Sequence, residues 1–542
     1  MKKKLVSTFI ASFLAFGFFG QGPAIEWQKC LGGVYGDTVQ INDTTVYYSL
    51  GEDLIQKIRK TNDGGYIVVG TTSSNNTDVS GNHGLKDIWV VKLNSSGIIQ
   101  WQKCYGGSYD EYGSDIQQTT DGGYIVCGWT GSNDGDVVGF HGNPNYFQDF
   151  PSDFFVLKIS NSGVIQWKKC LGGSGTEGAN AIKQTSDGGY IVAGSTNTNN
   201  NGDVTGFNPN NSNNSDAWVV KLTSSGNIDW KKCYGDSEND SFNSVEILND
   251  GSFYFSGTTG SYQTSGNHGG YDFWVVKTDG FGNVLWKKLY GGSANDYGNS
   301  LKITPDQGFV FTGETYSHNG DVSGSNNVFS NNDVWVFRAD NLGNIIWQNS
   351  LGGTINEGGN DVVVTADGGY AVTGYTNSFN GDVNYNYGYK DFWIVKLNSA
   401  GSKTWEKCYG GVYDDISNSI VETTDGGFVL AGSIESNDFN STISGYHGNG
   451  DGWVVKLGYY NEIQDMKKLD LSIFPNPTTN SFTIKGEKNI NQSFSIFDQM
   501  GREVFKGKLT GTETEVNLSM LSKGIYTLKI EGNYQPAQIV KE

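Results

Sequence analysis

Short runs of apolar residues, separated by turns rich in Gly and Asn, extend along most of this chain. The runs are rich in Val, Ile, Tyr, Phe and Trp, the residues that favour β-strands. Turns such as "DGG" and "NSSG" between them carry glycines, which adopt a positive φ without strain. Many short strands joined by such turns predict an all-β protein.

The pattern repeats seven times with a period of about 60 residues. Its landmarks are a Trp, a "DGGY"-like turn and a "D-x-W-V-V-K" run. The Trp residues are Trp27, Trp101, Trp167, Trp230, Trp286, Trp347 and Trp405. The turns begin at Asp63, Asp121, Asp187, Asp250, Asp306, Asp367 and Asp425, and the runs at Asp87, Asp153, Asp216, Asp272, Asp333, Asp391 and Asp451.

The distances between these landmarks show which connections vary in length. The aromatic residue of each run precedes the next Trp by 12 residues in all six cases. The Trp precedes the next turn by 20 residues in six cases and by 36 in the first. From turn to run the distance varies between 22 and 32 residues. Each repeat therefore has one connection of freely variable length.

Each repeat predicts four antiparallel strands, named A to D here. In the second repeat, A is "SDIQQT" and B is "GYIVCGWT", whereas the first repeat supplies "DIWVVKL" as C and "GIIQWQK" as D. Seven such units are typical of a seven-bladed β-propeller. A stacked solenoid is the alternative, but the chain shows no atypical capping repeats at its ends.

The first landmark Trp stands in "AIEWQKCLGG" (24–33), which has no strand C before it. At the other end, the last strand C, "DGWVVKL" (451–457), has no strand D after it. We predict that the N-terminal segment supplies the missing outer strand of the last blade, because this pairing removes an open sheet edge. The propeller is then expected over residues 21–457, with a linker at 458–470.

Residues 1–20 contain three lysines and then the apolar run "LVSTFIASFLAFGFFG". A basic start before a short apolar run predicts a cleaved secretory signal peptide. No other long apolar run occurs, so no transmembrane segment is expected in the mature chain.

The formal net charge is −20, and residues 466–542 hold ten Lys or Arg against eight Asp or Glu, so the excess acid lies before them. This balance argues against nucleic acid or an anionic membrane as a partner. Five of the six cysteines share one repeat position, too far apart for disulfides, and are predicted to be small buried side chains.

Ligand binding is expected on the face that carries the variable B–C loops, since loops on a rigid scaffold commonly carry function. The sixteen extra residues of the first D–A connection lie on the same face. Aromatic side chains in these loops would suit stacking on sugars, although packing within their own loops is an equal alternative. They are Tyr47, Tyr48, Trp129, Phe140, Tyr146, Phe147, Tyr385, Tyr387 and Tyr446.

Two sets of carboxylates recur in the repeats. Four B–C loops share "G-D-V", and these Asp-rich loops suggest Ca²⁺ ligands, with Asx turns as the simpler alternative. The residues are Asp134, Asp136, Asp203, Asp321 and Asp382. Another acidic residue stands ten positions before each turn: Asp53, Glu111, Glu177, Asp240, Asp296, Glu357 and Asp415. It predicts either a ring of carboxylates around the channel or a repeated structural contact, such as a turn hydrogen bond. The Asp that opens each "DxWVVK" run is expected to brace its blade.

The sequence gives little support for catalysis. The five histidines stand singly in Gly- and Asn-rich loops, and no G-x-S-x-G, H-E-x-x-H or phosphate-binding glycine motif occurs. The carboxylates recur from blade to blade, whereas a glycosidase needs one particular pair. We therefore favour a binding protein over an enzyme, and no catalytic residue is assigned.

After residue 470 the repeat gives way to "IFPNPTTNSFTI", "FSIFDQMGREV", "LSKGIYTLKI" and "QIVKE". In this order they resemble the type A C-terminal sorting domain of the type IX secretion system. The resemblance implies an Ig-like β-sandwich over residues 471–542, recognition by the type IX machinery, and a Gram-negative bacterium that displays or releases the protein. An ordinary Ig-like binding module is the alternative. The "KLNSSGIIQW" hairpin is similar to that of quinoprotein propellers in architecture only, because no cofactor ligands match.

The resulting expectation is a secreted or cell-surface propeller that binds a glycan or protein through its B–C loops. A secreted polysaccharide-degrading enzyme and a structural envelope or matrix protein are the alternatives.

Overall fold

The computed structural model describes residues 22–34, 39–41, 44–46, 52–142, 151–208, 214–260, 266–325, 331–435, 441–448, 450–460, 471–486, 493–498, 502–530 and 537–542. The predicted signal peptide lies outside these residues. Over the described residues the structure is built of strands and turns without a helix, and therefore contains no helix able to cross a membrane. Two compact units divide the chain, Met1–Gly458 and Tyr459–Glu542.

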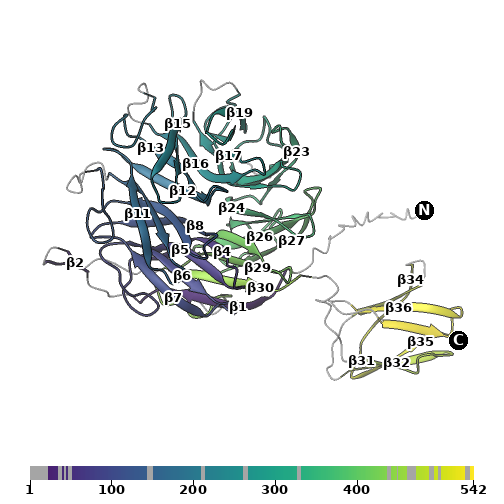
Figure 1. Cartoon of the computed structure of the whole chain (residues 1–542). Coiled ribbons are helices and arrows are strands. Elements are labelled where there is room, and N and C mark those ends of the chain that lie inside the picture. The colour runs from purple at the N-terminus through teal and green to yellow at the C-terminus, as the bar shows by residue number, and fades with distance from the viewer. Residues whose placement is uncertain are drawn as a thin grey trace, which may run out of the picture. The chain divides into compact units, whose positions relative to one another are not determined.

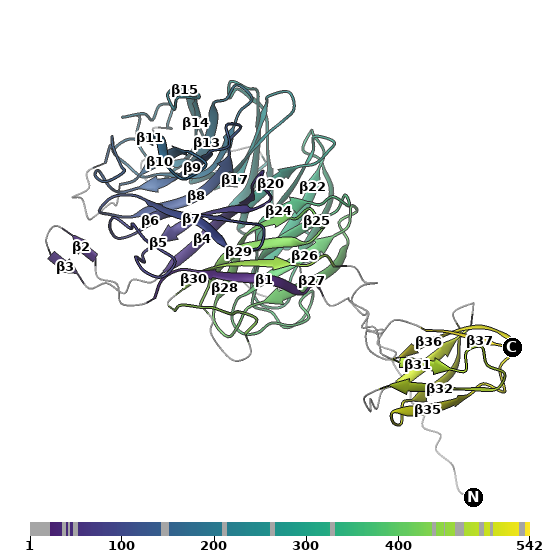
Figure 2. The same ribbon diagram turned by 60° about the horizontal axis from the view of Figure 1, so that its bottom comes forward.

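Unit 1 contains seven antiparallel four-stranded sheets around a common axis, with the A strands innermost (Figure 1 and Figure 2). The A strands are β4 (Asp53–Lys60), β8 (Glu111–Gln118), β12 (Glu177–Gln184), β16 (Asp240–Ile247), β20 (Asp296–Ile303), β24 (Glu357–Val364) and β28 (Asp415–Glu422). The B strands are β5 (Tyr66–Thr72), β9 (Tyr124–Thr130), β13 (Tyr190–Thr196), β17 (Phe253–Thr259), β21 (Phe309–Thr315), β25 (Tyr370–Thr376) and β29 (Phe428–Ile434). The C strands are β6 (Asp87–Leu93), β10 (Asp153–Ile159), β14 (Asp216–Leu222), β18 (Asp272–Thr278), β22 (Asp333–Ala339), β26 (Asp391–Leu397) and β30 (Asp451–Leu457). The D strands are β7 (Ile99–Tyr105), β11 (Ile165–Leu171), β15 (Ile228–Tyr234), β19 (Val284–Tyr290), β23 (Ile345–Leu351), β27 (Lys403–Tyr409) and β1 (Ile25–Leu31).

The predicted pairing of the two ends is confirmed. Strand β1 lies antiparallel to β30, with Cys30 opposite Trp453 and Gln28 opposite Val455. The Trp453 indole Nε1 donates a hydrogen bond to Oε1 of Gln28 at 3.1 Å. Leu31 is fully buried and packs with residues of both the last and the first blade. The fold is therefore a seven-bladed propeller whose last blade is completed by the N-terminal strand.

Neighbouring blades are held together by apolar side chains on their faces and by amides near the axis. Each A strand carries a bulge, and five of the bulged residues are Asn. The side-chain amide of each donates to a backbone carbonyl of the next blade at 2.8–3.0 Å; the donors are Asn180, Asn243, Asn299, Asn360 and Asn418. The last of these bonds, from Asn418 to the carbonyl of Ile55, joins blade seven to blade one. Hydrogen bonds thus hold the ring closed at the axis, through the Asn418 side chain, as well as at its rim, through the pairing of β1 with β30.

The recurring acidic residue does not form a ring around the open channel. It is the first residue of strand A, and each of the seven is almost fully buried. Glu111 accepts a hydrogen bond from the backbone N–H of Gly107 at 2.7 Å and another from the Thr130 hydroxyl at 2.6 Å. The buried carboxyl thus holds the D–A connection in place. The prediction of a repeated structural contact is therefore confirmed, and the alternative, a ring of carboxylates around the channel, is wrong.

A second buried carboxyl faces each of these residues across the glycine that follows strand D, which is the first of a "GG" pair at six of the seven junctions. Between the first and second blades, the two carboxyls are those of Glu111, which opens strand A of the second blade, and Asp87, which opens strand C of the first blade. A Cβ placed on Gly106 would lie 2.3 Å from Glu111 Oε2 and 2.5 Å from Asp87 Oδ1. The described residues donate no hydrogen bond to this Oδ1 atom. Two carboxyls lie beside the glycine in the same way at all seven junctions, at Gly32, Gly106, Gly172, Gly235, Gly291, Gly352 and Gly410.

We expect Gly106→Ala to lower the free energy of unfolding by about 1–3 kcal/mol, the usual effect of forcing a methyl group into a filled space. Gly178→Ala is the matched control, because a Cβ there meets nothing within 4 Å. Thermal or denaturant unfolding of both variants measures the difference. Equal stability of the two variants would contradict the close approach of the carboxyl pair.

The six cysteines are free, and four of the five at the shared repeat position are buried, as predicted, whereas Cys233 is partly exposed. Unit 2 consists of two antiparallel sheets that enclose their own apolar core. Its strands are β31 (Leu471–Phe474), β32 (Ser481–Gly486), β33 (Ser493–Phe497), β34 (Glu503–Lys508), β35 (Glu513–Asn517), β36 (Gly524–Ile530) and β37 (Ala537–Lys541). In the first D–A connection, β2 (Val39–Ile41) and β3 (Thr44–Val46) form a small hairpin.

Candidate functional site

The predicted ligand-binding aromatics lie in different environments. Tyr47, Tyr48, Tyr146 and Phe147 fall outside the residues whose side chains the structure describes. Phe140 is 8% exposed and packs in the core between two blades, so little of its ring is open to a ligand. Tyr385 is 61% exposed and meets Tyr387 edge-on, with ring centroids 4.9 Å apart. Tyr446 is half-buried, and its hydroxyl accepts a hydrogen bond from the Gly450 N–H.

Trp129 lies near the end of β9, beside the B–C loop, and is partly exposed. Its ring stacks on Tyr112 of the adjacent strand β8, with centroids 4.4 Å apart. The ammonium group of Lys86 lies 5.1 Å from the centroid of the Tyr112 ring and donates to the Tyr112 hydroxyl and to Glu52, at 2.9 Å in each case. These four residues form a flat aromatic surface with a charged edge, here called the Trp129 cluster.

A second aromatic group, here called the tyrosine cluster, lies on the same face at blades four to six. Tyr297 contacts Tyr271 and Tyr316, with centroid separations of 5.4 and 6.3 Å. Beside them the Tyr375 hydroxyl donates to Glu314 at 3.3 Å, and Lys390 lies over the Tyr375 ring at 4.8 Å. Burial raises the pKa of Glu314, which Tyr375 and Lys390 partly oppose.

The tyrosine cluster and Tyr112 were missed because they belong to strands or strand ends rather than to the variable loops. One structural position, shared by the second residue of strand A and its partner on strand B, is large only in some blades. It holds Tyr112 with Trp129, Tyr297 with Glu314, and Gly358 with Tyr375. The other four blades place Leu54 with Thr71, Gly178 with Ser195, Ser241 with Thr258, and Ile416 with Ser433. Comparing this one position across the repeats would have revealed the clusters.

The structure does not bring the predicted calcium ligands together. Asp134 and Asp136 share a loop, whereas Asp203, Asp321 and Asp382 each belong to a different blade. Among the described residues, no group of three or more His, Cys, Asp or Glu side chains is arranged to hold a metal ion. Calcium binding by these loops stays a prediction.

Instead, the "GDV" aspartates support neighbouring loops. The Asp136 N–H donates to the carbonyl of Gly106 at 2.7 Å, and its Oδ2 lies 3.9 Å from Nε2 of His83 in the preceding blade. The equivalent histidine contacts of Asp203 and Asp321 measure 3.8 and 3.7 Å, from His141 and His268. Asp134 Oδ1 accepts from the Ser108 N–H at 2.7 Å, and Asp382 pairs with Lys403 at 2.7 Å.

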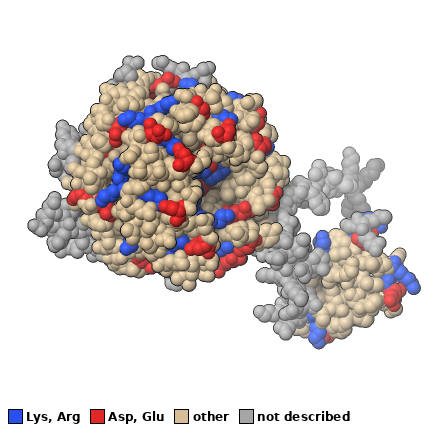
Figure 3. Space-filling view, in the orientation of Figure 1, with Lys and Arg blue, Asp and Glu red and all other residues tan. Residues whose placement is uncertain are grey.

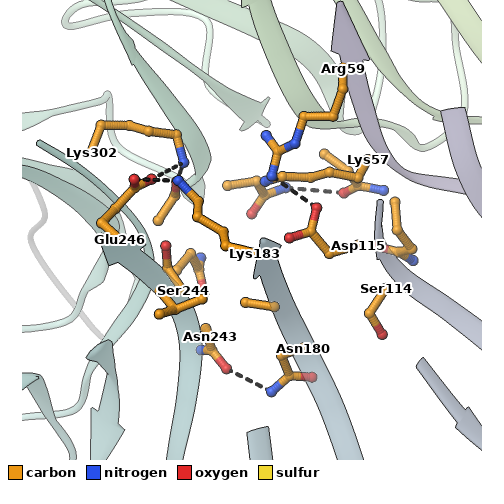
Figure 4. Close-up of a pocket in the computed structure, with 17 residues that line it drawn as sticks. Lys57, Arg59, Ser114, Asp115, Asn180, Lys183, Asn243, Ser244, Glu246 and Lys302 are labelled. Atoms are coloured by element: carbon orange, nitrogen blue, oxygen red, sulfur yellow. Dashed lines mark hydrogen bonds and ion pairs between the residues drawn. The ribbon is translucent and has the colours of Figure 1, made fainter. Parts of the chain in front are cut away.

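The central channel holds a charged cavity of about 360 Å³ that sequence reasoning did not identify (Figure 4). Arg59 pairs with Asp115 at 2.8 Å, and Lys57 with the fully buried Asp361 at 3.0 Å. Lys183 pairs with Glu246, and Lys302 lies 3.4 Å from the same carboxylate. All these side chains come from A strands of six different blades.

The cavity continues into a wider vestibule of about 630 Å³, because Arg59, Lys183, Glu246 and Lys302 line both. The vestibule also includes residues at the A–B turns, such as Asn62 and Thr120, and it therefore opens on the face opposite the B–C loops. In the space-filling view, Lys and Arg atoms lie at the edge of a hollow in the propeller surface (Figure 3).

Residues 472–541 match the family model described as "Secretion system C-terminal sorting domain". No curated protein matches the chain. The match to the sorting domain confirms the resemblance stated from the sequence. The chain is therefore a propeller protein with a type IX sorting domain, secreted or carried on the cell surface of a Gram-negative bacterium.

Solved propeller structures show similarity at low identity. The WD40 domain of Neurospora crassa Pan2 is 12% identical, with 75% of this chain and 90% of that chain covered and a TM-score of 0.41. The WD40 propeller of Doa1 is 8% identical, with 79% and 97% covered and a TM-score of 0.41. PorZ, a surface component of the type IX secretion system of Porphyromonas gingivalis, is 10% identical, with 96% and 86% covered and a TM-score of 0.33.

Proposed function

We propose that this secreted propeller binds a glycan on its B–C loop face through the Trp129 cluster and the tyrosine cluster. The stacked pair of Trp129 and Tyr112 carries the proposal, because it holds an indole partly exposed and rigid on two paired strands. A rigid, partly exposed aromatic ring offers an apolar face to a sugar ring and loses little conformational entropy on binding. Lys86, Glu52, Lys390 and Glu314 supply hydrogen-bonding groups at the edges of these surfaces.

Two observations favour this face over the rest of the propeller surface. The B–C loops vary in length, whereas the opposite turns are constant. The exposed aromatic side chains Tyr385, Tyr389 and Tyr413 also lie on this face, at 61, 63 and 55% exposure. A protein ligand is the alternative occupant, since exposed tyrosine is common at protein interfaces as well.

We expect Trp129→Ala and Tyr375→Ala each to weaken glycan binding by about tenfold or more, because truncation of an aromatic contact at the centre of an interface commonly has this effect. The full chain is first tested on a glycan array, and the variants are then titrated with the best ligand. Phe281→Ala is the control, since Phe281 is 74% exposed on a C–D turn of the opposite face.

A parallel turnover assay on the same glycans separates binding from hydrolysis. Glu314, a carboxyl with a raised pKa beside Tyr375, is the residue that a polysaccharide-degrading enzyme would use as an acid. If the unmodified chain releases product and the Glu314→Gln variant does not, the protein is a polysaccharide-degrading enzyme and the binding proposal is wrong. If the assays detect neither binding nor turnover, a structural role in the envelope or matrix is the remaining alternative.

A further inference from the structure

The central cavity presents more hydrogen-bond donors than the protein itself satisfies. Arg59, Lys57 and Lys183 each donate a single side-chain hydrogen bond within the described part of the chain, to Asp115, Asp361 and Glu246 respectively. A guanidinium group carries five N–H donors and an ammonium group three, so most donors of these three side chains are available to water or a ligand.

Two of the three carboxylates of the network, by contrast, are largely satisfied by the walls, whereas Glu246 pairs with Lys183 and Lys302. Asp361 accepts from the hydroxyls of Ser300 and Ser419 at 2.6 and 3.0 Å and from two backbone N–H groups. Asp115 accepts from the backbone N–H groups of Ile116 and Ile182 at 2.9 and 3.2 Å. Neutral donors thus already stabilise much of the negative charge, and four cations stand against three carboxylates in a chain whose net charge is −20.

The walls that hold these cations are rigid. The cavity is lined by the Asn side chains whose amides bond to the backbone of the next blade, and by A strands that are paired along their length. The donors are therefore held in place before any ligand arrives, which reduces the entropy lost on binding.

We propose that this cavity is a binding site for an oxyanion, either a free ion or the sulfate, phosphate or carboxylate group of a larger ligand. Arg59, Lys57 and Lys183 are its donors, Lys302 adds a positive charge beside them, and the vestibule at the A–B turns is its entrance. Charge-assisted hydrogen bonds to Arg and Lys are the usual means by which proteins hold such groups. The site is separate from the glycan surface proposed above, because it opens on the opposite face.

The burial of two of these lysines also favours the binding of an anion. Burial removes water from the ammonium groups of Lys57 and Lys183 and thereby lowers the pKa of each. An anion beside them reverses this effect, so binding should favour proton uptake and weaken as the pH rises.

The test is a titration of the full chain with inorganic sulfate, inorganic phosphate and glucose 6-sulfate, with glucose as the neutral counterpart, at constant ionic strength. We expect saturable binding of at least one of the anions and none of glucose. Binding of the free ions alone would identify the site as an ion site, whereas tighter binding of glucose 6-sulfate would identify a group on a larger ligand.

Two variants with opposite expected effects guard against misfolding as an explanation. Lys183→Gln should weaken anion binding by about tenfold, the effect of losing a charge-assisted hydrogen bond. Glu246→Gln removes a competing carboxylate and should strengthen binding several-fold. Lys287→Gln, a surface lysine whose side chain is 46% exposed, is the control and should bind as the unmodified chain does. Absence of saturable binding, or equal affinity in all three variants, would overturn the proposal.

Discussion

Removal of residues 22–31 is expected to open the ring of blades and to cause a large loss of stability. The deletion takes away strand β1 and its ladder with β30, together with the fully buried Leu31 and the nearly buried Cys30. It also removes the carbonyl of Pro23, which accepts a hydrogen bond from the Tyr409 hydroxyl. Several backbone hydrogen bonds and one fully buried leucine together correspond to about 5 kcal/mol or more.

The exposed edge has a second consequence. Without β1, strand β30 presents a row of unpaired backbone groups beside the apolar Trp453, and such an edge pairs readily with other chains. The shortened protein should therefore unfold at a markedly lower temperature and associate into larger species. Thermal unfolding and light scattering during size-exclusion chromatography measure the two effects.

Addition of a peptide with the sequence of residues 22–34 provides the control for general damage. The peptide should restore the unfolding temperature and the monomeric state, whereas the same peptide with Leu31→Asp should not, because that position is fully buried. An unchanged unfolding temperature after the deletion would contradict the role of β1 in closing the ring.

The sequence was sufficient to predict this closure because the landmarks that define strands C and D are twelve residues apart in every repeat. A turn of constant length leaves one arrangement of the hairpin, and the bounds of strand C, such as Asp87–Leu93, match the prediction residue for residue. The count of C and D strands then required the two ends of the chain to meet.

The channel could not be predicted in the same way, because the A strands do not follow simple alternation. A bulge at Gln56, and at the same position in every blade, changes which side chains face the axis. Lys57 and Arg59 then lie next to charged residues of other blades that are about 60 or more residues away in the sequence. Pairing across blades also explains why Asp115 and Lys183 gave no motif, because their charged partners, Arg59 and Glu246, lie in the strands of other blades.

The same reasoning applies to the buried acidic residues. Their regular spacing identified a repeated role, but their burial depends on Thr and Ser hydroxyls of strand B and on the N–H of a glycine in the D–A connection. These partners are drawn together only when the blade forms. The repeated carboxylate of this propeller therefore has a structural function, and burial is the cause of its raised pKa in Asp53 and Glu111.

Stability of the propeller is expected to fall as the pH rises from about 5 to about 8, the opposite of ordinary acid unfolding. Burial raises the pKa of Asp53 and Asp272 to about 6, of Asp153 and Asp451 to about 7, and of Glu111 to about 8. A carboxyl whose pKa is higher in the folded than in the unfolded state holds its proton more tightly when folded. Its stabilising effect is complete below the unfolded pKa and is lost as the pH rises through the folded pKa.

Two further groups of residues titrate outside the range from pH 5 to pH 8. Burial and nearby Asp residues also raise the pKa of Cys30 to about 12 and the pKa of Cys104 well above its usual value, so neither thiol titrates between pH 5 and pH 8. Hydrogen bonds from Thr and Lys lower the pKa of the turn residues Asp63, Asp121 and Asp187 to about 2, so their stabilising effect is lost only in strong acid. Each raised carboxyl changes the free energy of unfolding by about 1 kcal/mol per pH unit up to its folded pKa, so the total should fall by several kcal/mol between pH 5 and pH 8.

Urea unfolding at pH 5, 6, 7 and 8 measures this dependence, and Glu111→Gln isolates one carboxyl. The amide cannot ionise, so this variant should match the unmodified chain at pH 5 and exceed it in stability at pH 8. Asp63→Asn is the matched control: it breaks the ion pair with Lys92, 3.0 Å long, and should lower stability equally at all four pH values. Stability that rises toward pH 8, or a Glu111→Gln variant with the same slope as the unmodified chain, would contradict the assignment of retained protons to the carboxyl pairs between the blades.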